Sequence, residues 1–146
     1  MLFTSENLEG ERMEKVVVSV ELSENNYSAY LEQLPGCVST GKTFEELKKN
    51  IQEAIEFHLD TSREFNDEIS PVFDGDFELV YKFDTTSLLQ HYRGIFTNSA
   101  LERITGINQR QLQRYATGES KPRAAQVKKI ANAFHSIGRE LLIVEL

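Results

Sequence analysis

The 146-residue sequence lacks several features that mark common classes of protein. Its single cysteine, Cys37, rules out a disulfide within the chain and favours a reducing cytoplasm. No apolar run approaches the roughly 20 residues that span a bilayer. The N-terminus has no basic region followed by an apolar one, as a secretory signal would. No phosphate-binding glycine loop is present, because Gly36 and Gly41 bracket a short strand. We therefore predict a cytoplasmic protein of one domain or two very small ones.

Charge is distributed unevenly along the chain, whose net charge is −7. Residues 1–84 carry 7 Lys and Arg against 19 Asp and Glu, whereas residues 85–146 carry 9 against 4. The acidic half is expected to be repelled by DNA and to attract a basic protein. The basic half can hold phosphates electrostatically. This asymmetry predicts two modules with different partners.

The acidic half has the periodicity of a small sheet with one helix, in the order β-β-β-α-β over residues 14–84. A hairpin is expected from the first two strands, because only a short polar segment separates them. Thr43 and Glu46 form a capping box at the start of the helix, which is expected to end in the polar stretch 61–67. Its apolar stripe consists of Phe44, Leu47, Ile51, Ile55 and Leu59. The predicted strands are 14–22, 27–33, 37–40 and 77–83. Residues 1–13 are expected to be a disordered leader, with Met13 as an alternative start.

The basic half, residues 85–146, is predicted to be all-α, so that the whole chain is α+β. A helix is expected at 85–96, capped by Thr85 or Thr86, and another helix is expected after Pro122, a residue that suits the first turn of a helix. The buried face of this last helix is predicted to consist of Val127, Ile130, Ala131, Phe134 and Ile137. The apolar end, 141–146, is either the end of that helix or a strand that pairs with a second copy of the chain. We expect a homodimer or a higher even oligomer.

Residues 97–122 predict two short helices joined by a tight turn at Gly106, where glycine reaches positive φ at no steric cost. Asn108 is the expected N-cap of the second helix, and Leu112 and Tyr115 are expected to face the core. The remaining side chains of this helix turn outward, and Gln and Arg are suited to reading adenine and guanine in the major groove. No acidic residue occurs in 107–117. A solvated helix in an ordinary bundle is the alternative. The predicted DNA contacts are Thr97, Asn98, Asn108, Gln109, Arg110, Gln111, Gln113, Arg114, Lys121 and Arg123.

No catalytic constellation is evident, and we predict no enzyme activity, no cofactor and no metal site. The run Asp74, Asp76 and Glu78 could mimic a cation site, and a metal-dependent nuclease is the alternative function that it would support. A hard cation needs several converging oxygens, however, and this run supplies one local set only. The histidines at 58, 91 and 135 are too scattered for a zinc pair at helical spacing. Cys37 is expected to be a buried structural thiol rather than a nucleophile.

The acidic half contains three short motifs in order: Tyr27-Ser-Ala-Tyr30, Leu34-Pro35-Gly36-Cys37-Val38, and Gly41, Thr43 and Glu46 before the long helix. Through these motifs it resembles the HicB antitoxin family over about residues 14–84. The resemblance implies a fold like a truncated RNase H core. It also implies an antitoxin that neutralises a small basic toxin of the HicA type, an mRNA-cleaving ribonuclease. Many members of the family carry a C-terminal DNA-binding module.

The turn segment in the basic half has a second pattern, formed by Leu101, Gly106, Ile107, Leu112, Tyr115, Gly118 and the pair Lys121-Pro122. With this pattern the segment resembles the Xre/Cro-like helix-turn-helix family. Glu102 departs from the family pattern, which has a small alanine there. The two resemblances together imply an antitoxin that also represses its own operon by binding double-stranded operator DNA. A stand-alone helix-turn-helix transcriptional regulator without a toxin partner is the alternative.

Overall fold

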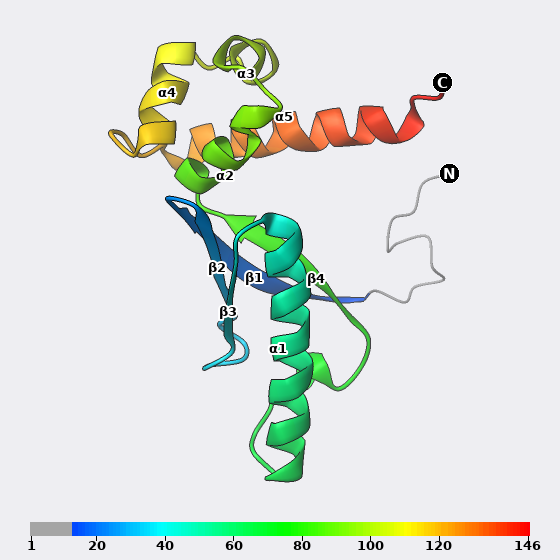
Figure 1. The fold of residues 1–146 in the computed structure, drawn as a ribbon. Helices are drawn as coiled ribbons and strands as arrows, with labels where there is room; N and C mark the ends of the chain where they lie inside the picture. Colours follow the sequence, from blue (N-terminus) through cyan, green and yellow to red (C-terminus); the bar gives the residue numbers. More distant parts are fainter. Residues whose placement is uncertain (1–12) are drawn as a thin grey trace. The chain divides into compact units, whose positions relative to one another are not determined.

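The computed structural model describes residues 13–146, which form two compact units divided between Phe83 and Asp84 (Figure 1). The expected leader lies outside the described residues except for the exposed Met13. The first unit has the element order β-β-β-α-β, and the second unit contains helices only. This order confirms the α+β prediction.

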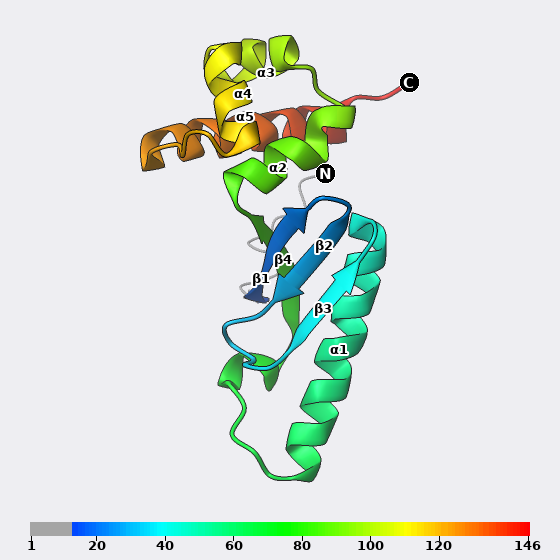
Figure 2. The same ribbon diagram turned by 60° about the vertical axis from the view of Figure 1, so that its left-hand side comes forward.

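The first unit is built on a four-stranded mixed sheet of order β3-β2-β1-β4 (Figure 2). Its strands are β1 (Glu14–Ser23), β2 (Asn26–Tyr30), β3 (Val38–Gly41) and β4 (Phe77–Phe83). The β1–β2 pair is the expected antiparallel hairpin, and β2 and β3 are also antiparallel. Strand β4 pairs in parallel with β1, so that Val20 lies opposite both Ala29 and Phe83. Strand β1 is therefore paired on both sides.

Helix α1 (Phe44–Glu64) lies along one face of this sheet (Figures 1 and 2). It begins as predicted, because the Thr43 side chain accepts a hydrogen bond of 3.0 Å from the Glu46 amide. Its stripe packs on Val16, Val18 and Val20 of β1 in one core, through the buried Leu47, Ile51, Ile55 and Leu59. Gly41 permits the close approach of β3, since a Cβ there would lie 2.5 Å from the Leu47 amide nitrogen.

Several boundaries in the first unit differ from the sequence prediction. The second strand ends at Tyr30 rather than at residue 33, because the chain turns to bury Leu31 and Leu34 in the core. The third strand begins one residue late, at Val38. Helix α1, by contrast, ends at Glu64 within the polar stretch as predicted, although Ser62 of that stretch is buried. The expected loop around Pro71 contains a short 3₁₀ helix, η2 (Pro71–Phe73), whose Phe73 joins the core.

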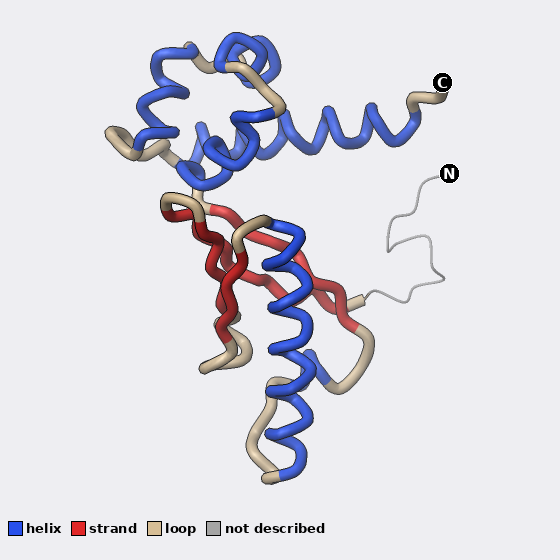
Figure 3. The backbone as a smooth tube through the Cα atoms, in the orientation of Figure 1, coloured by secondary structure: helices blue, strands red, loops and turns tan. Residues whose placement is uncertain are grey.

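The second unit is a small helical bundle (Figure 3). Its elements are α2 (Thr85–His91), the 3₁₀ helix η3 (Tyr92–Gly94), α3 (Asn98–Thr105), α4 (Gln109–Thr117) and α5 (Ala124–Ile143). A second core holds them together, built from Leu89, Leu101, Ile107, Leu112, Tyr115, Ala116 and Ile130. Phe134 of α5 adds an aromatic contact to Tyr92, with ring centroids 5.2 Å apart. Each helix therefore contributes at least one side chain to this core.

The structure also corrects details of the second unit. Helix α2 ends at His91, and its N-cap is Asp84 rather than Thr85 or Thr86. Helix α5 follows Pro122 as predicted, but it begins at Ala124 with Arg123 as its N-cap, so Pro122 lies before the first turn rather than in it. Val127, predicted to be buried, is 42% exposed, and Ala133 is buried instead. The apolar end continues α5 to Ile143 and forms no strand.

Candidate nucleic-acid interface

The turn between α3 and α4 is fixed by the Thr105 hydroxyl. This buried group donates to the Leu101 carbonyl at 2.6 Å and accepts from the Ile107 amide at 3.1 Å. Between them Gly106 adopts φ 75°, a left-handed conformation that suits glycine. The Asn108 side chain then caps α4 by accepting from the Arg110 amide at 2.8 Å, as predicted. The turn is short and its polar groups are paired, so the angle between α3 and α4 is well defined.

Helix α4 divides into a buried face and an exposed face. Leu112 and Tyr115 lie in the core as predicted, together with Ala116, and the helix ends at Gly118 with φ 80°. Gln109, Arg110, Gln113 and Arg114 are exposed. Gln111 differs from the prediction in being half-buried, and its amide approaches the Ser120 hydroxyl at 3.4 Å. The outward face of α4 is therefore made by two glutamines and two arginines.

The four exposed side chains are engaged to different degrees within the second unit. Gln109 donates to the Glu102 carboxylate at 3.0 Å. Glu102, which stands where the helix-turn-helix pattern has alanine, is thus bound to a side chain of α4. Gln113 accepts from the Asn98 side chain at 2.9 Å. Arg114 has a loose ion pair of 3.6 Å with Glu119. The Arg110 guanidinium has no side-chain partner within the described residues. Arg110 is thus the side chain on α4 that is freest to meet a ligand.

The C-terminal end of α4 is held by α2, a feature that sequence reasoning missed. Thr86 donates from its hydroxyl to the Tyr115 carbonyl at 2.8 Å, and Gln90 donates from its amide to the Ala116 carbonyl at 2.8 Å. The last carbonyls of a helix lack the usual partner one turn further on, so the bond from Gln90 satisfies an Ala116 carbonyl that would otherwise need water. The Tyr115 carbonyl accepts from the Gly118 amide at 3.2 Å as well as from Thr86. Thr86 and Gln90 lie four residues apart on α2 and therefore on one face. The sequence therefore predicts that the two side chains lie on the same face of α2, but it does not indicate which carbonyl groups they bind.

The other predicted contact residues surround α3 and the α4–α5 connection. Thr97 is the N-cap of α3 and accepts from the Ala100 amide at 3.0 Å, while Asn98 is half-buried against Gln113. Lys121 and Arg123 are exposed on either side of Pro122. Positive side chains at such positions can contact phosphates, which position a protein on a duplex without reading its sequence.

The remaining ionisable candidates are Cys37, the histidines and the acidic residues at 74–78. Burial raises the pKa of the Cys37 thiol, so the buried sulfur remains protonated, which agrees with a structural role. Burial also lowers the pKa of His91. Among residues 13–146, no three His, Cys, Asp or Glu side chains come together as a metal site, and Asp74 and Asp76 are exposed. Within the same residues no helix combines the length and apolar character needed to cross a membrane.

The turn geometry predicts a specific effect of Thr105. Replacing it with valine keeps the shape but leaves the buried Ile107 amide without an acceptor, which costs about 1–3 kcal/mol. We expect Thr105→Val to lower the free energy of unfolding of the second unit by that amount, measured by urea denaturation. Thr105→Ser retains the hydroxyl and is the matched control. Equal stability of the valine variant and the wild type would show that the turn does not depend on this hydroxyl.

Comparison with known proteins bears on the first unit. Residues 16–76 match the family model described as "HicB_like antitoxin of bacterial toxin-antitoxin system". A UPF0150 protein of Helicobacter pylori (strain J99) is 52% identical over 40 residues, which are 27% of this chain and 56% of that protein. The chain thus spans about half the length of this relative. The second unit, from Asp84 onward, lies outside the family match. These findings support a HicB-like antitoxin domain at residues 16–76.

Proposed function

We propose that this chain is the antitoxin of a HicA/HicB-type toxin–antitoxin pair and represses its own operon. The first unit neutralises a small, basic, mRNA-cleaving toxin in the cytoplasm, and the second unit binds operator DNA as a helix-turn-helix. The chain has no catalytic role. The observation that carries the proposal is the match of residues 16–76 to the HicB-like antitoxin family. Its β-β-β-α-β order suits the truncated RNase H-like core that the resemblance implies.

The DNA-binding part of the proposal is supported by α4. In a helix-turn-helix the second helix enters the major groove and its exposed side chains contact base edges. Here α3, the Gly106 turn and α4 have that order, and the exposed face of α4 carries two arginines, two glutamines and no acid. Arg pairs in bidentate fashion with guanine, and Gln with adenine. Lys121 and Arg123 would then hold phosphates beside the groove.

A dimer forms part of the proposal, because helix-turn-helix readers address two half-sites one DNA turn apart. The apolar side chains of α5 and its end recur at alternating spacings of three and four, which is typical of helix pairs. They are Val127, Ile130, Phe134, Ile137, Leu141 and Val144. Ile130 is buried in the second core, whereas Leu141 is 66% exposed. We propose that the exposed end of this stripe pairs with the same stripe of a second copy.

Neutralisation is tested by co-expression with the product of the adjacent small reading frame. We expect that product to stop growth alone, and the full-length chain to restore growth and to co-purify with it. The Arg110→Ala/Arg114→Ala double variant is the matched control, because it should still rescue growth while losing DNA binding. A neighbour that is neither toxic nor bound would favour the stand-alone regulator.

DNA reading is tested by titrating the chain with the DNA upstream of its own gene. We expect Arg110→Ala and Arg114→Ala each to cost about 1–3 kcal/mol of specific binding, because each would lose a contact to a base. Arg139→Ala, an exposed arginine of α5, removes the same charge away from α4 and is the control. If all three variants weaken binding equally, net charge rather than α4 determines affinity.

Dimerisation is tested by inserting a charge into the exposed stripe. We expect Leu141→Glu to halve the molar mass measured by light scattering and to weaken operator binding, because a carboxylate would be buried in the pair without a partner. Asn132→Glu introduces the same charge on an exposed position of α5 outside the stripe. A Leu141→Glu chain with unchanged mass would exclude this interface.

A further inference from the structure

Two large aromatic side chains at the far end of α1 are left in solvent. Phe57 is 75% exposed and Phe65, which follows the last helical residue, is 69% exposed. Phe57 lies opposite the stripe that packs on the sheet, because Ile55 and Leu59 two residues on either side of it are buried. Neither ring contributes to the core of the first unit. Exposed aromatics of this size are typical anchors of protein–protein interfaces.

The surface around Phe57 is acidic. Glu53 and Asp60 lie about one helical turn before and after it, and Glu64 lies two turns after it on the same side. Arg63, the last-turn cation of α1, donates to the Phe73 carbonyl at 3.3 Å and lies 3.9 Å from the Asp60 carboxylate, so it offsets only part of this acidic charge. A hollow of about 560 Å³ adjoins the same helix, and the carboxylates that line it, Glu56, Asp60, Asp74 and Asp76, outnumber its one Lys or Arg side chain, Arg63.

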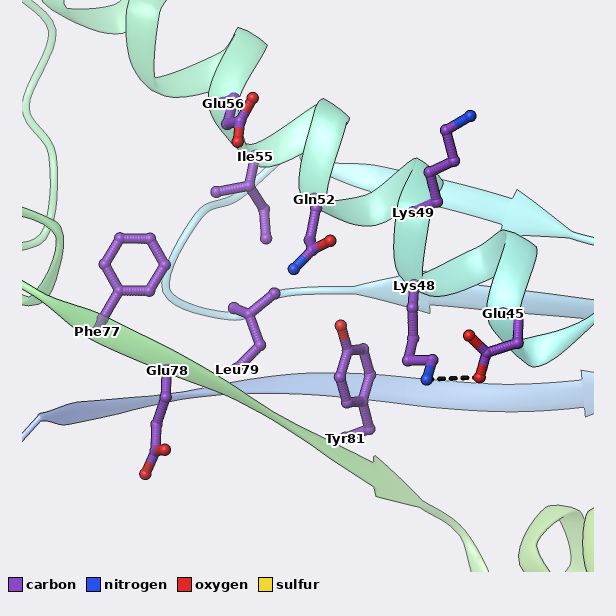
Figure 4. A pocket seen from close by; sticks show the side chains of 10 residues that line it. All are labelled: Glu45, Lys48, Lys49, Gln52, Ile55, Glu56, Phe77, Glu78, Leu79 and Tyr81. Carbon is purple, nitrogen blue, oxygen red and sulfur yellow. Dashed lines mark ion pairs between the residues drawn. The ribbon is translucent and has the colours of Figure 1, made fainter. Parts of the chain in front are cut away.

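The first half of α1 has a different character. Figure 4 shows the groove between that half and β4, with a volume of about 570 Å³. Lys48 and Lys49 line it, and Lys48 forms an ion pair of 2.6 Å with Glu45. Positive and negative groups are thus balanced in the first half of α1, whereas the second half presents carboxylates around an aromatic ring. Only the second half has the charge to select a basic partner.

We propose that the outer face of the second half of α1 is the docking surface for the basic toxin, an inference that rests on the proposed antitoxin function. Phe57 inserts into an apolar hollow of the partner, and Phe65 packs beside it. Glu53, Asp60 and Glu64 pair with lysines and arginines at the rim. In such an arrangement, the buried aromatic ring supplies most of the binding free energy. The charges around it favour a basic partner over other proteins.

The anchor is tested by calorimetric titration of the full-length chain with a catalytically inactive variant of the product of the adjacent small reading frame. We expect Phe57→Ala to weaken binding roughly tenfold or more, as the loss of an interface anchor does. Val38→Ala removes a side chain of similar exposure, 66%, from the sheet and should change affinity less than roughly threefold. Circular dichroism melting curves verify that both variants fold.

The charged rim is tested with two triple variants of equal net charge. Glu53→Gln/Asp60→Asn/Glu64→Gln should weaken binding and reduce its dependence on salt. Glu14→Gln/Glu21→Gln/Glu32→Gln neutralises three exposed carboxylates outside α1 and should have a smaller effect on both. Comparing the two triple variants separates a local effect of the rim carboxylates from an effect of total charge. Salt screens the interactions of exposed charges beyond about 8 Å at physiological ionic strength, so distant carboxylates should contribute little.

The possible outcomes distinguish the docking surface from the proposed function. If the wild type binds the toxin and Phe57→Ala binds it equally well, the antitoxin function stands and the docking surface is wrong. If Phe57→Ala changes the molar mass of the chain by itself while toxin affinity is unchanged, the face joins two copies, which also overturns the inference. If the wild type neither binds nor neutralises the toxin, the proposed function fails first.

Discussion

The first unit depends on the packing of one helix against a strand that is paired on both sides. Strand β1 has β2 on one side and β4 on the other, so its inward valines can be buried only beneath a covering element. Helix α1 is that element, and its apolar stripe fixes which way the helix is turned. The opposite side of α1 does not pack in the core of the first unit. Phe57 on that side leaves a large aromatic ring in solvent, and an exposed aromatic of this kind is typical of a surface that binds another protein.

The second unit depends on a different constraint, the pairing of backbone groups at both ends of α4. Asn108 satisfies an amide at its start, and Thr86 and Gln90 satisfy carbonyls at its end. Because these bonds come from the turn and from α2, α4 has little freedom to rotate or slide. A side chain such as Arg110 therefore projects from a rigid support, which is what a base-reading or phosphate-binding group requires.

Periodicity was enough to predict the order of elements, and its errors share one cause. The alternating strand pattern extended past Tyr30 in the sequence, so the second strand was predicted too long. Leu31 and Leu34 are buried in the core from a turn, where side chains do not alternate between two faces. Helical spacing likewise placed Val127 in the core, although α5 meets the rest of its unit only further along, at Ile130. Local patterns show which side chains are apolar, but the partner element decides where burial begins and ends.

The sequence by itself determined the α+β order, the caps at Thr43 and Asn108 and the positive-φ glycine at 106, because each depends on neighbouring residues and their spacing. Only the tertiary structure decided that β4 pairs in parallel with β1 and that α2 caps the end of α4, since both join residues distant in the chain. The spacing of the apolar stripe places Phe57 on the opposite side of α1, but only the packing of the first unit shows that its ring is left 75% exposed, because covering it would need a contact distant in the chain.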